Sequence, residues 1–219
     1  MFSDRWIALS RTFAALAVFV TFQCVAQPTL TPTVITYLAV IGCGTVIASF
    51  LISPDTARIR WKKSSATHRR LANVVRVAVV AHIILGVIGR RSGLLLIGSG
   101  AAEWAGVGVC ASCMAMLCWT VVLNPFLTPG VSVDAARRQF TVVGGPYRYV
   151  RHPHYANCIA LWFGSILASG SWLSGLPFLP VFVLLIRRIL NEDAFLCIHL
   201  PGYRLYQLQV QYRLLPYLW

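Results

Sequence analysis

Long apolar runs dominate the chain and set its predicted architecture. An α-helix needs about 20 mostly apolar residues to cross the ~30 Å hydrocarbon core of a bilayer. Four such runs precede residue 124, at 6–26, 34–52, 71–89 and 104–123. A fifth and a sixth lie within 155–186, an uncharged stretch divided by the small and polar residues 169–175 around Trp172. The pattern predicts an all-α, polytopic integral membrane protein with about six transmembrane helices, the last two forming a tight hairpin.

The composition agrees with this pattern and argues against other classes. Hydrophobic residues make up 58% of the chain and charged residues 11%, whereas a soluble domain carries roughly a quarter charged residues. Nineteen bases against six acids give a net charge of +13. In so apolar a chain, this excess is typical of cytoplasmic loops facing anionic lipid, not of a nucleic-acid-binding surface. The seven cysteines lack paired metal-ligand spacing, so we expect neither a metal site nor a disulfide scaffold.

The positions of the bases predict the orientation in the membrane. Six bases lie between Arg58 and Arg70, and the positive-inside rule places that loop in the cytoplasm. Alternation from there puts both termini and the connection 124–154 on the same side and leaves only Arg90 and Arg91 outside. The run 6–26 has no clear cleavage site after it and is predicted to be a retained helix. The long polar segments therefore gather on the cytoplasmic side, where we expect any chemistry.

Two features of the fourth span predict contacts between helices. Gly106-Val107-Gly108 imitates part of a dinucleotide fingerprint but has no strand before it, so it favours close helix packing. Glu103, at the mouth of the same span, is predicted to face Arg90 or Arg91.

The first polar segment of interest reads GGPYRYVRHPHY over residues 144–155. Two prolines fix its backbone, and aromatic rings, arginines and histidines stand between them. One interpretation is a basic anchor at the membrane interface. The other is a binding site, because an Arg-His pair at the start of a helix lies beside backbone N–H groups that donate hydrogen bonds to a carboxylate or phosphate.

The second polar segment follows the sixth span and contains the adjacent acids Glu192 and Asp193. Pairing with Arg187 or Arg188 one turn earlier is the simple interpretation. The functional interpretation is a carboxylate that binds a cationic ligand or amine. Because the hairpin returns the chain to the side it left, Glu192 is predicted to lie near Arg151 and His152.

The order of these segments resembles the C-terminal half of the isoprenylcysteine carboxyl methyltransferase family, and related phospholipid methyltransferases share the pattern. The resemblance covers 124–219 and rests on residues 145–155, the acid pair, and the runs LPGYRLY at 200–206 and YRLLP at 212–216. It divides the chain into four N-terminal spans, 1–123, and a catalytic region, 124–219. Two positions depart from the family pattern: Asn157 replaces a glycine and Asp193 replaces a glutamate.

The resemblance implies S-adenosyl-L-methionine as the cofactor, bound in a cytosolic pocket. A tyrosine ring face suits the cationic sulfur, and a glutamate accepts hydrogen bonds from the amino group or the ribose. Arg151 and Arg213 are the expected catalytic residues, since a guanidinium binds a carboxylate in a bidentate fork. The cofactor-binding residues that we expect are Pro146, Tyr147, His152, Pro153, Tyr155, Glu192, Asp193 and Tyr203.

The predicted reaction is methyl transfer to a lipophilic acceptor from the bilayer, with a carboxylate as the favoured acceptor because it arrives already deprotonated. A phospholipid N-methyltransferase is an alternative, and a non-catalytic membrane protein with a degenerate pocket is another. The segment 212–216 resembles bacterial members, so the expected location is a bacterial inner membrane.

Overall fold

The computed structural model describes residues 31–51, 66–127, 133 and 138–219. The predicted span 6–26 and the loop bases Arg58, Arg60, Lys62 and Lys63 lie outside the described residues. The described residues form helices and isolated turns, with one β-bridge between Leu96 and Ser171. The helices are α2 (Pro32–Leu51), α4 (Ala66–Ser92), α5 (Gly100–Leu123), α6 (Pro153–Ser169), α7 (Phe178–His199) and α8 (Tyr203–Gln209), with the 3₁₀ turns η2 (Gly145–Arg148) and η3 (Trp172–Gly175).

Four helical stretches in the described part are long and apolar enough to cross a membrane: Pro32–Leu51, Arg70–Ser92, Gly100–Leu123 and Trp172–His199. They correspond to the predicted spans at 34–52, 71–89 and 104–123 and to the second arm of the hairpin. The first arm, α6, has 17 residues and reaches about 26 Å, a little less than the hydrocarbon thickness. The prediction of an all-α, multi-pass membrane protein is confirmed, and the described residues support four of the six predicted spans.

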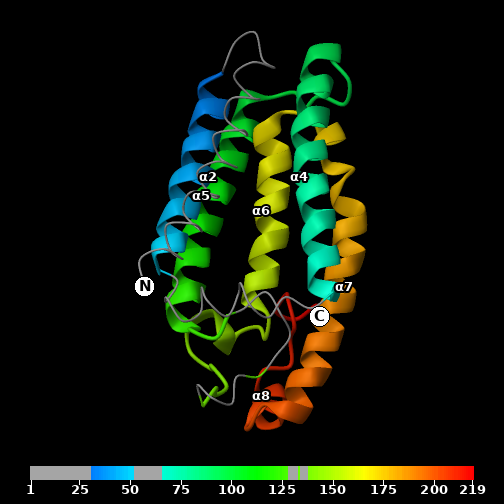
Figure 1. Cartoon of the computed structure of the whole chain (residues 1–219). Helices are drawn as coiled ribbons and strands as arrows, with labels where there is room; N and C mark the ends of the chain where they lie inside the picture. Colours follow the sequence, from blue (N-terminus) through cyan, green and yellow to red (C-terminus); the bar gives the residue numbers. More distant parts are fainter. Residues whose placement is uncertain (1–30, 52–65, 128–132, 134–137) are drawn as a thin grey trace, which may run out of the picture.

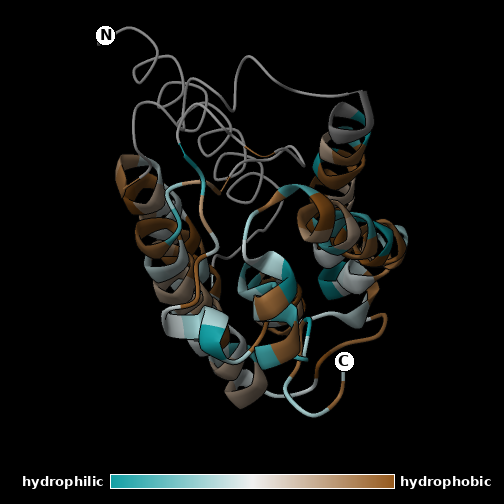
Figure 2. Cartoon of the chain, turned by 90° about the horizontal axis from the view of Figure 1, so that it is seen from below, coloured by the Kyte–Doolittle hydropathy of each residue, from teal (hydrophilic) through white to brown (hydrophobic). Residues whose placement is uncertain are grey.

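The helices form an elongated bundle (Figure 1). Helices α2, α5, α6 and α4 run side by side, while α7 continues past the lower ends of its neighbours and carries α8 at its tip. The segment after α8 turns back toward the base of the bundle. Figure 2 views the chain from this end, where hydrophilic residues are interspersed among hydrophobic ones. The motif segments therefore lie at one end of the bundle.

The tightest helix contact joins α5 to α6 through glycine. A Cβ added at Gly106 would lie 2.5 Å from the Ala168 nitrogen and 2.7 Å from the Gly164 oxygen, so no side chain fits there. Small residues of this kind let membrane helices approach closely. Gly108 has no heavy atom within 4 Å of such a Cβ. The predicted packing role is therefore confirmed for Gly106 but not for Gly108.

The opposite end of the bundle is held by an ion pair. Arg90 lies 2.7 Å from Glu103, as the sequence predicts, and its Nε donates to the Ser169 carbonyl at 2.6 Å. The Thr33 hydroxyl donates to the same Glu103 carboxylate at 2.7 Å. Gly170, at φ +76, lets the chain turn directly over the guanidinium of Arg90, where a Cβ would lie 2.6 Å away. Helices α2, α4, α5 and α6 are thus joined far from the motif segments.

Gly106→Ala is expected to lower the thermal midpoint of the detergent-solubilised protein. The added methyl group must push α5 away from the backbone of α6, and overpacking of this kind costs about 1–3 kcal/mol. The matched control is Gly108→Ala, where open space and the better helix propensity of alanine should leave the midpoint unchanged or raise it. Equal effects of the two substitutions, measured by circular dichroism, would contradict the packing role of Gly106.

Candidate functional site

The segment before α6 has a fixed backbone. Gly145 adopts a positive φ of 57°, and a Cβ there would collide with Leu123 of α5. Pro146 and Pro153 stand in the first turns of η2 and α6, positions that tolerate the missing N–H. His152 is the N-cap residue of α6 and contributes no side-chain cap. The side chains of residues 151 and 152 are therefore available for contacts with α7.

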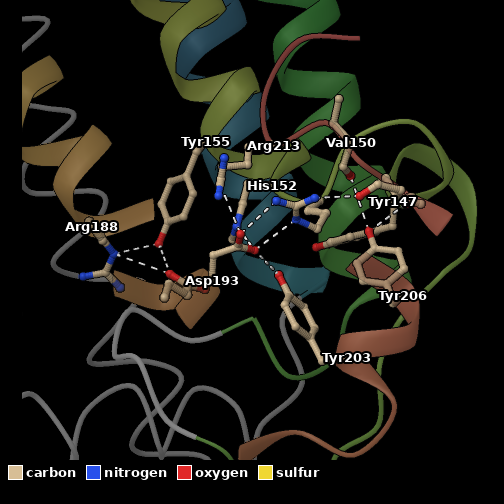
Figure 3. Close-up of polar contacts among 12 residues, drawn as sticks. Tyr147, Val150, His152, Tyr155, Arg188, Asp193, Tyr203, Tyr206 and Arg213 are labelled. Carbon is tan, nitrogen blue, oxygen red and sulfur yellow. Dashed lines mark hydrogen bonds and ion pairs between the residues drawn. The ribbon is translucent and has the colours of Figure 1, made fainter. Parts of the chain in front are cut away.

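The carboxylate of Asp193 is the centre of the site (Figure 3). Arg151 binds it in a bidentate fork, with Nε 3.0 Å from Oδ1 and Nη2 2.8 Å from Oδ2. The Tyr203 hydroxyl donates to Oδ1 at 2.7 Å and Arg213 Nε donates to Oδ2 at 3.1 Å. His152 Nε2 lies 3.3 Å from Oδ1. The Asp193 side chain is only 3% exposed, so its oxygens are occupied by protein groups.

The same arginine fastens the segment after α8. Arg151 Nη1 donates to the carbonyls of Val210 and Gln211 at 2.7 and 2.8 Å. The backbone N–H groups of Arg151 and His152 donate to the carbonyls of Tyr212 and Arg213, each at 2.9 Å. All three guanidinium nitrogens of Arg151 therefore have protein partners, and the arginine positions the tail of the chain.

Glu192 faces a different set of partners. The Tyr155 hydroxyl donates to Glu192 Oε2 at 2.5 Å and accepts a hydrogen bond from Arg188 Nε at 2.6 Å. Arg188 also lies 3.8 Å from Glu192, one turn earlier on α7, as the simple interpretation of the acid pair predicted. The Glu192 side chain is 23% exposed, in contrast to its buried neighbour Asp193. The more accessible carboxylate of the pair is therefore Glu192.

A cluster of tyrosines supports the C-terminal end of α7. Tyr147, Tyr203 and Tyr206 pack with Leu200 and Val210 in one buried apolar cluster. Burial raises the pKa of the Tyr147 hydroxyl to about 12, and the pKa of Tyr203 is also raised, by burial and by the Asp193 carboxylate. These hydroxyls therefore stay neutral at physiological pH and serve as hydrogen-bonding groups, with Tyr206 donating to the Tyr147 carbonyl at 2.7 Å.

The structure brings most of the predicted residues together at one end of the bundle. The predicted meeting of the motif segment with the acid pair is observed, but Asp193 rather than Glu192 contacts Arg151 and His152. Asn157, which replaces the family glycine, turns toward α5 and donates to the Cys113 carbonyl at 3.0 Å. It therefore connects two helices and points away from the acid pair.

Several contributing groups were not predicted. Asn124 donates to the Tyr147 hydroxyl at 2.9 Å, and the carbonyls of Val210 and Gln211 bind Arg151. Tyr206 had a sequence signal, because it stands three residues after Tyr203 on the same face of a helix. Backbone carbonyls in a segment without regular structure carry no signal in the sequence.

Comparison with known families finds a match for the middle part of the chain. Residues 103–199 match the model of the phospholipid methyltransferase family. The match confirms the resemblance drawn from the motifs, but it includes α5 and ends before α8 and the tail. A comparison with curated proteins found no match.

The chain is thus a multi-pass membrane protein with a segment that matches the phospholipid methyltransferase family. The family segment contains the acid pair, Arg151, His152 and Tyr155, whereas Tyr203 and Arg213 lie beyond it. The groups that close the Asp193 cluster therefore come from outside the matched residues.

Asp193→Asn is expected to destabilise the protein, whereas Glu192→Gln is not. The first change leaves the buried Arg151 and the half-buried Arg213 without a countercharge, and breaking a buried pair in this way costs on the order of 3 kcal/mol. The second change affects a partly exposed carboxylate, whose surface-type ion pair is worth about 0–1 kcal/mol. Thermal midpoints in detergent test this order, and a larger loss for Glu192→Gln would contradict the central role of Asp193.

Proposed function

We propose that this protein transfers a methyl group from S-adenosyl-L-methionine to a lipophilic acceptor that it takes from the bilayer. The observation that carries the proposal is a partly exposed carboxylate, Glu192, hydrogen-bonded to Tyr155 at the end of a membrane-spanning bundle within a methyltransferase-family segment. Following the charge distribution, we propose a cytoplasmic position for this end and for both termini, in a bacterial inner membrane.

The described residues fit the polar and cationic parts of such a cofactor. We propose that Glu192 accepts hydrogen bonds from the amino group or the ribose of the cofactor, which its partial exposure supports. The Arg188 guanidinium carbon lies 5.9 Å from the centre of the Tyr155 ring, so this ring already tolerates a cation nearby. Tyr147 and Tyr203 are packed in the apolar cluster, where we propose that, with Pro146 and Pro153, they support the pocket.

The roles that we propose for the two arginines differ. The cofactor supplies a methyl group on a sulfonium, and transfer breaks the carbon–sulfur bond as the acceptor atom forms the new bond. Arg213 is 32% exposed and is the arginine that we propose to orient an anionic acceptor. Arg151, with all its nitrogens engaged, is proposed as a positioning residue. His152 is held by Asp193 and shares this role.

The favoured acceptor is a carboxylate, because no proton then has to be removed before transfer. Phospholipid N-methylation is the second candidate, and the description of the matched family favours it. An amine must lose a proton before it can accept the methyl group. In that case we propose that Glu192, which is partly exposed, takes this proton. The third candidate is a non-catalytic membrane protein with a degenerate pocket, and a failure to bind the cofactor would favour it.

Glu192→Gln is expected to weaken binding of S-adenosylhomocysteine, measured by calorimetry on the solubilised protein. A hydrogen bond to a charged group is worth about 1.5–3 kcal/mol, which corresponds to a roughly ten- to hundredfold loss of affinity. Asn191→Gln, an exposed position on the same turn, is the matched control and should bind like the unchanged protein. Absence of binding by the unchanged protein at millimolar ligand would reject the methyltransferase proposal.

The acceptor class can be determined from the chemistry of the product. The protein is incubated with lipid extract and S-adenosyl-L-methionine labelled in the methyl group, and the lipid fraction is then treated with mild base. A methyl ester releases labelled methanol, whereas an N-methyl group keeps its label. Label that resists base would replace the carboxylate proposal with phospholipid N-methylation.

A further inference from the structure

The segment after α8 ends in a compact fold on the surface of the bundle. Three consecutive backbone N–H groups, those of Arg213, Leu214 and Leu215, converge on the backbone oxygen of Trp219 at 2.8, 2.9 and 3.3 Å. Successive N–H groups that point to one place form a concavity that favours negative charge. The Arg213 guanidinium adds a full positive charge at its edge.

The Trp219 side chain occupies an apolar seat beside this concavity. Its ring packs against a cluster formed by Leu185 and Ile189 of α7 and by Leu214, with Tyr155 and Ile159 of α6 at the border. The Arg213 guanidinium carbon lies 5.5 Å from the centre of the ring. The seat therefore lies between α6 and α7, next to the Tyr155 side chain that contacts Glu192.

The link between the concavity and the seat makes few contacts with the rest of the chain. Leu215, Tyr217 and Leu218 are 52%, 89% and 77% exposed. Tyr217 also has a positive φ of 66°, an unfavourable conformation for a bulky side chain. Two turn hydrogen bonds, from the Leu218 and Trp219 N–H groups to the Leu215 carbonyl at 3.2 Å each, shape residues 215–219. The oxygen and the ring of Trp219 and a ring contact of Tyr217 with Tyr212, with centroids 5.4 Å apart, hold this turn against the rest of the chain.

We propose that residues 215–219 form a displaceable plug in a binding groove for an amphiphile with an anionic head and an apolar chain. The anionic oxygen would replace the Trp219 oxygen at the N–H groups of residues 213–215, beside Arg213. The apolar chain would replace the indole ring on Leu185 and Ile189. This inference rests on the proposed function in one respect, since it makes the groove the acceptor site.

The apolar seat of the Trp219 ring suits an acceptor with an alkyl chain better than it suits the cofactor. Its lining is mainly aliphatic, and Leu185, Ile186 and Ile189 of this lining lie on α7, a helix long and apolar enough to cross a membrane. An alkyl chain gains free energy from such a surface in proportion to the apolar area buried. The adenosine of the cofactor, with its many hydrogen-bonding groups, would leave them unpaired there.

The test measures binding of a fluorescent amphiphile, 11-(dansylamino)undecanoic acid, to the detergent-solubilised full chain without S-adenosyl-L-methionine. Trp219→Ala removes the ring that competes for the seat and should bind the acid at least tenfold more tightly than the unchanged protein. Leu218→Ala, a neighbouring and exposed position, should bind like the unchanged protein. The uncharged methyl ester of the probe should bind at least tenfold more weakly than the acid.

Four results would overturn the proposal: unchanged or weaker binding by Trp219→Ala, tighter binding by Leu218→Ala, equal binding of acid and ester, or displacement of the acid by S-adenosylhomocysteine. The last would assign the concavity to the carboxylate of the cofactor. If the alanine variant does not fold, Trp219→Phe is used in its place. Its smaller ring fills less of the seat, so the proposal again expects tighter binding of the acid, and unchanged or weaker binding would overturn it. Because the probe experiment contains no methyl donor, a failed plug and a failed methyltransferase give separate results.

Discussion

One buried carboxylate determines how the α8 end of this protein is assembled. Asp193 joins the start of α8 and the tail to the segment before α6, which lies about 40 residues earlier in the sequence. A single negative charge is shared between two guanidinium groups, one of them almost fully buried. Such an arrangement is tolerated only with good geometry and complete hydrogen bonding. The tail therefore has a defined path although it contains no regular structure after α8.

Adjacent positions on a helix point about 100° apart, which explains why the two acids have different partners. Asp193 faces the segment before α6 and α8, while Glu192 faces Tyr155 and Arg188. The shorter aspartate side chain holds its partners close to the α7 backbone. The longer glutamate extends to a region that solvent reaches. One residue thus holds the structure together, and its neighbour remains able to meet a ligand.

Much of this arrangement could be predicted from the sequence. Hydrophobic runs indicate helices, and a helical hairpin returns the chain to the end of the bundle from which it started. The helices from residue 32 onward, the Arg90–Glu103 pair and the meeting of the motif with the acid pair follow from such signals. The sequence could not show that Asp193, and not Glu192, contacts Arg151 and His152. This depends on which face of α7 is turned toward the segment before α6. The tail carbonyls that bind Arg151 are backbone groups, which every residue possesses.

The glycine contact between α5 and α6 also closes one side of the bundle to an alkyl chain. With the backbone of Gly106 against those of Gly164 and Ala168, no acyl chain fits between these two helices. Asn157 adds a hydrogen bond across the same seam, so the seam stays closed over several turns. Under the proposed function, an acceptor that arrives from the bilayer therefore cannot enter between α5 and α6 and has to pass between another pair of helices.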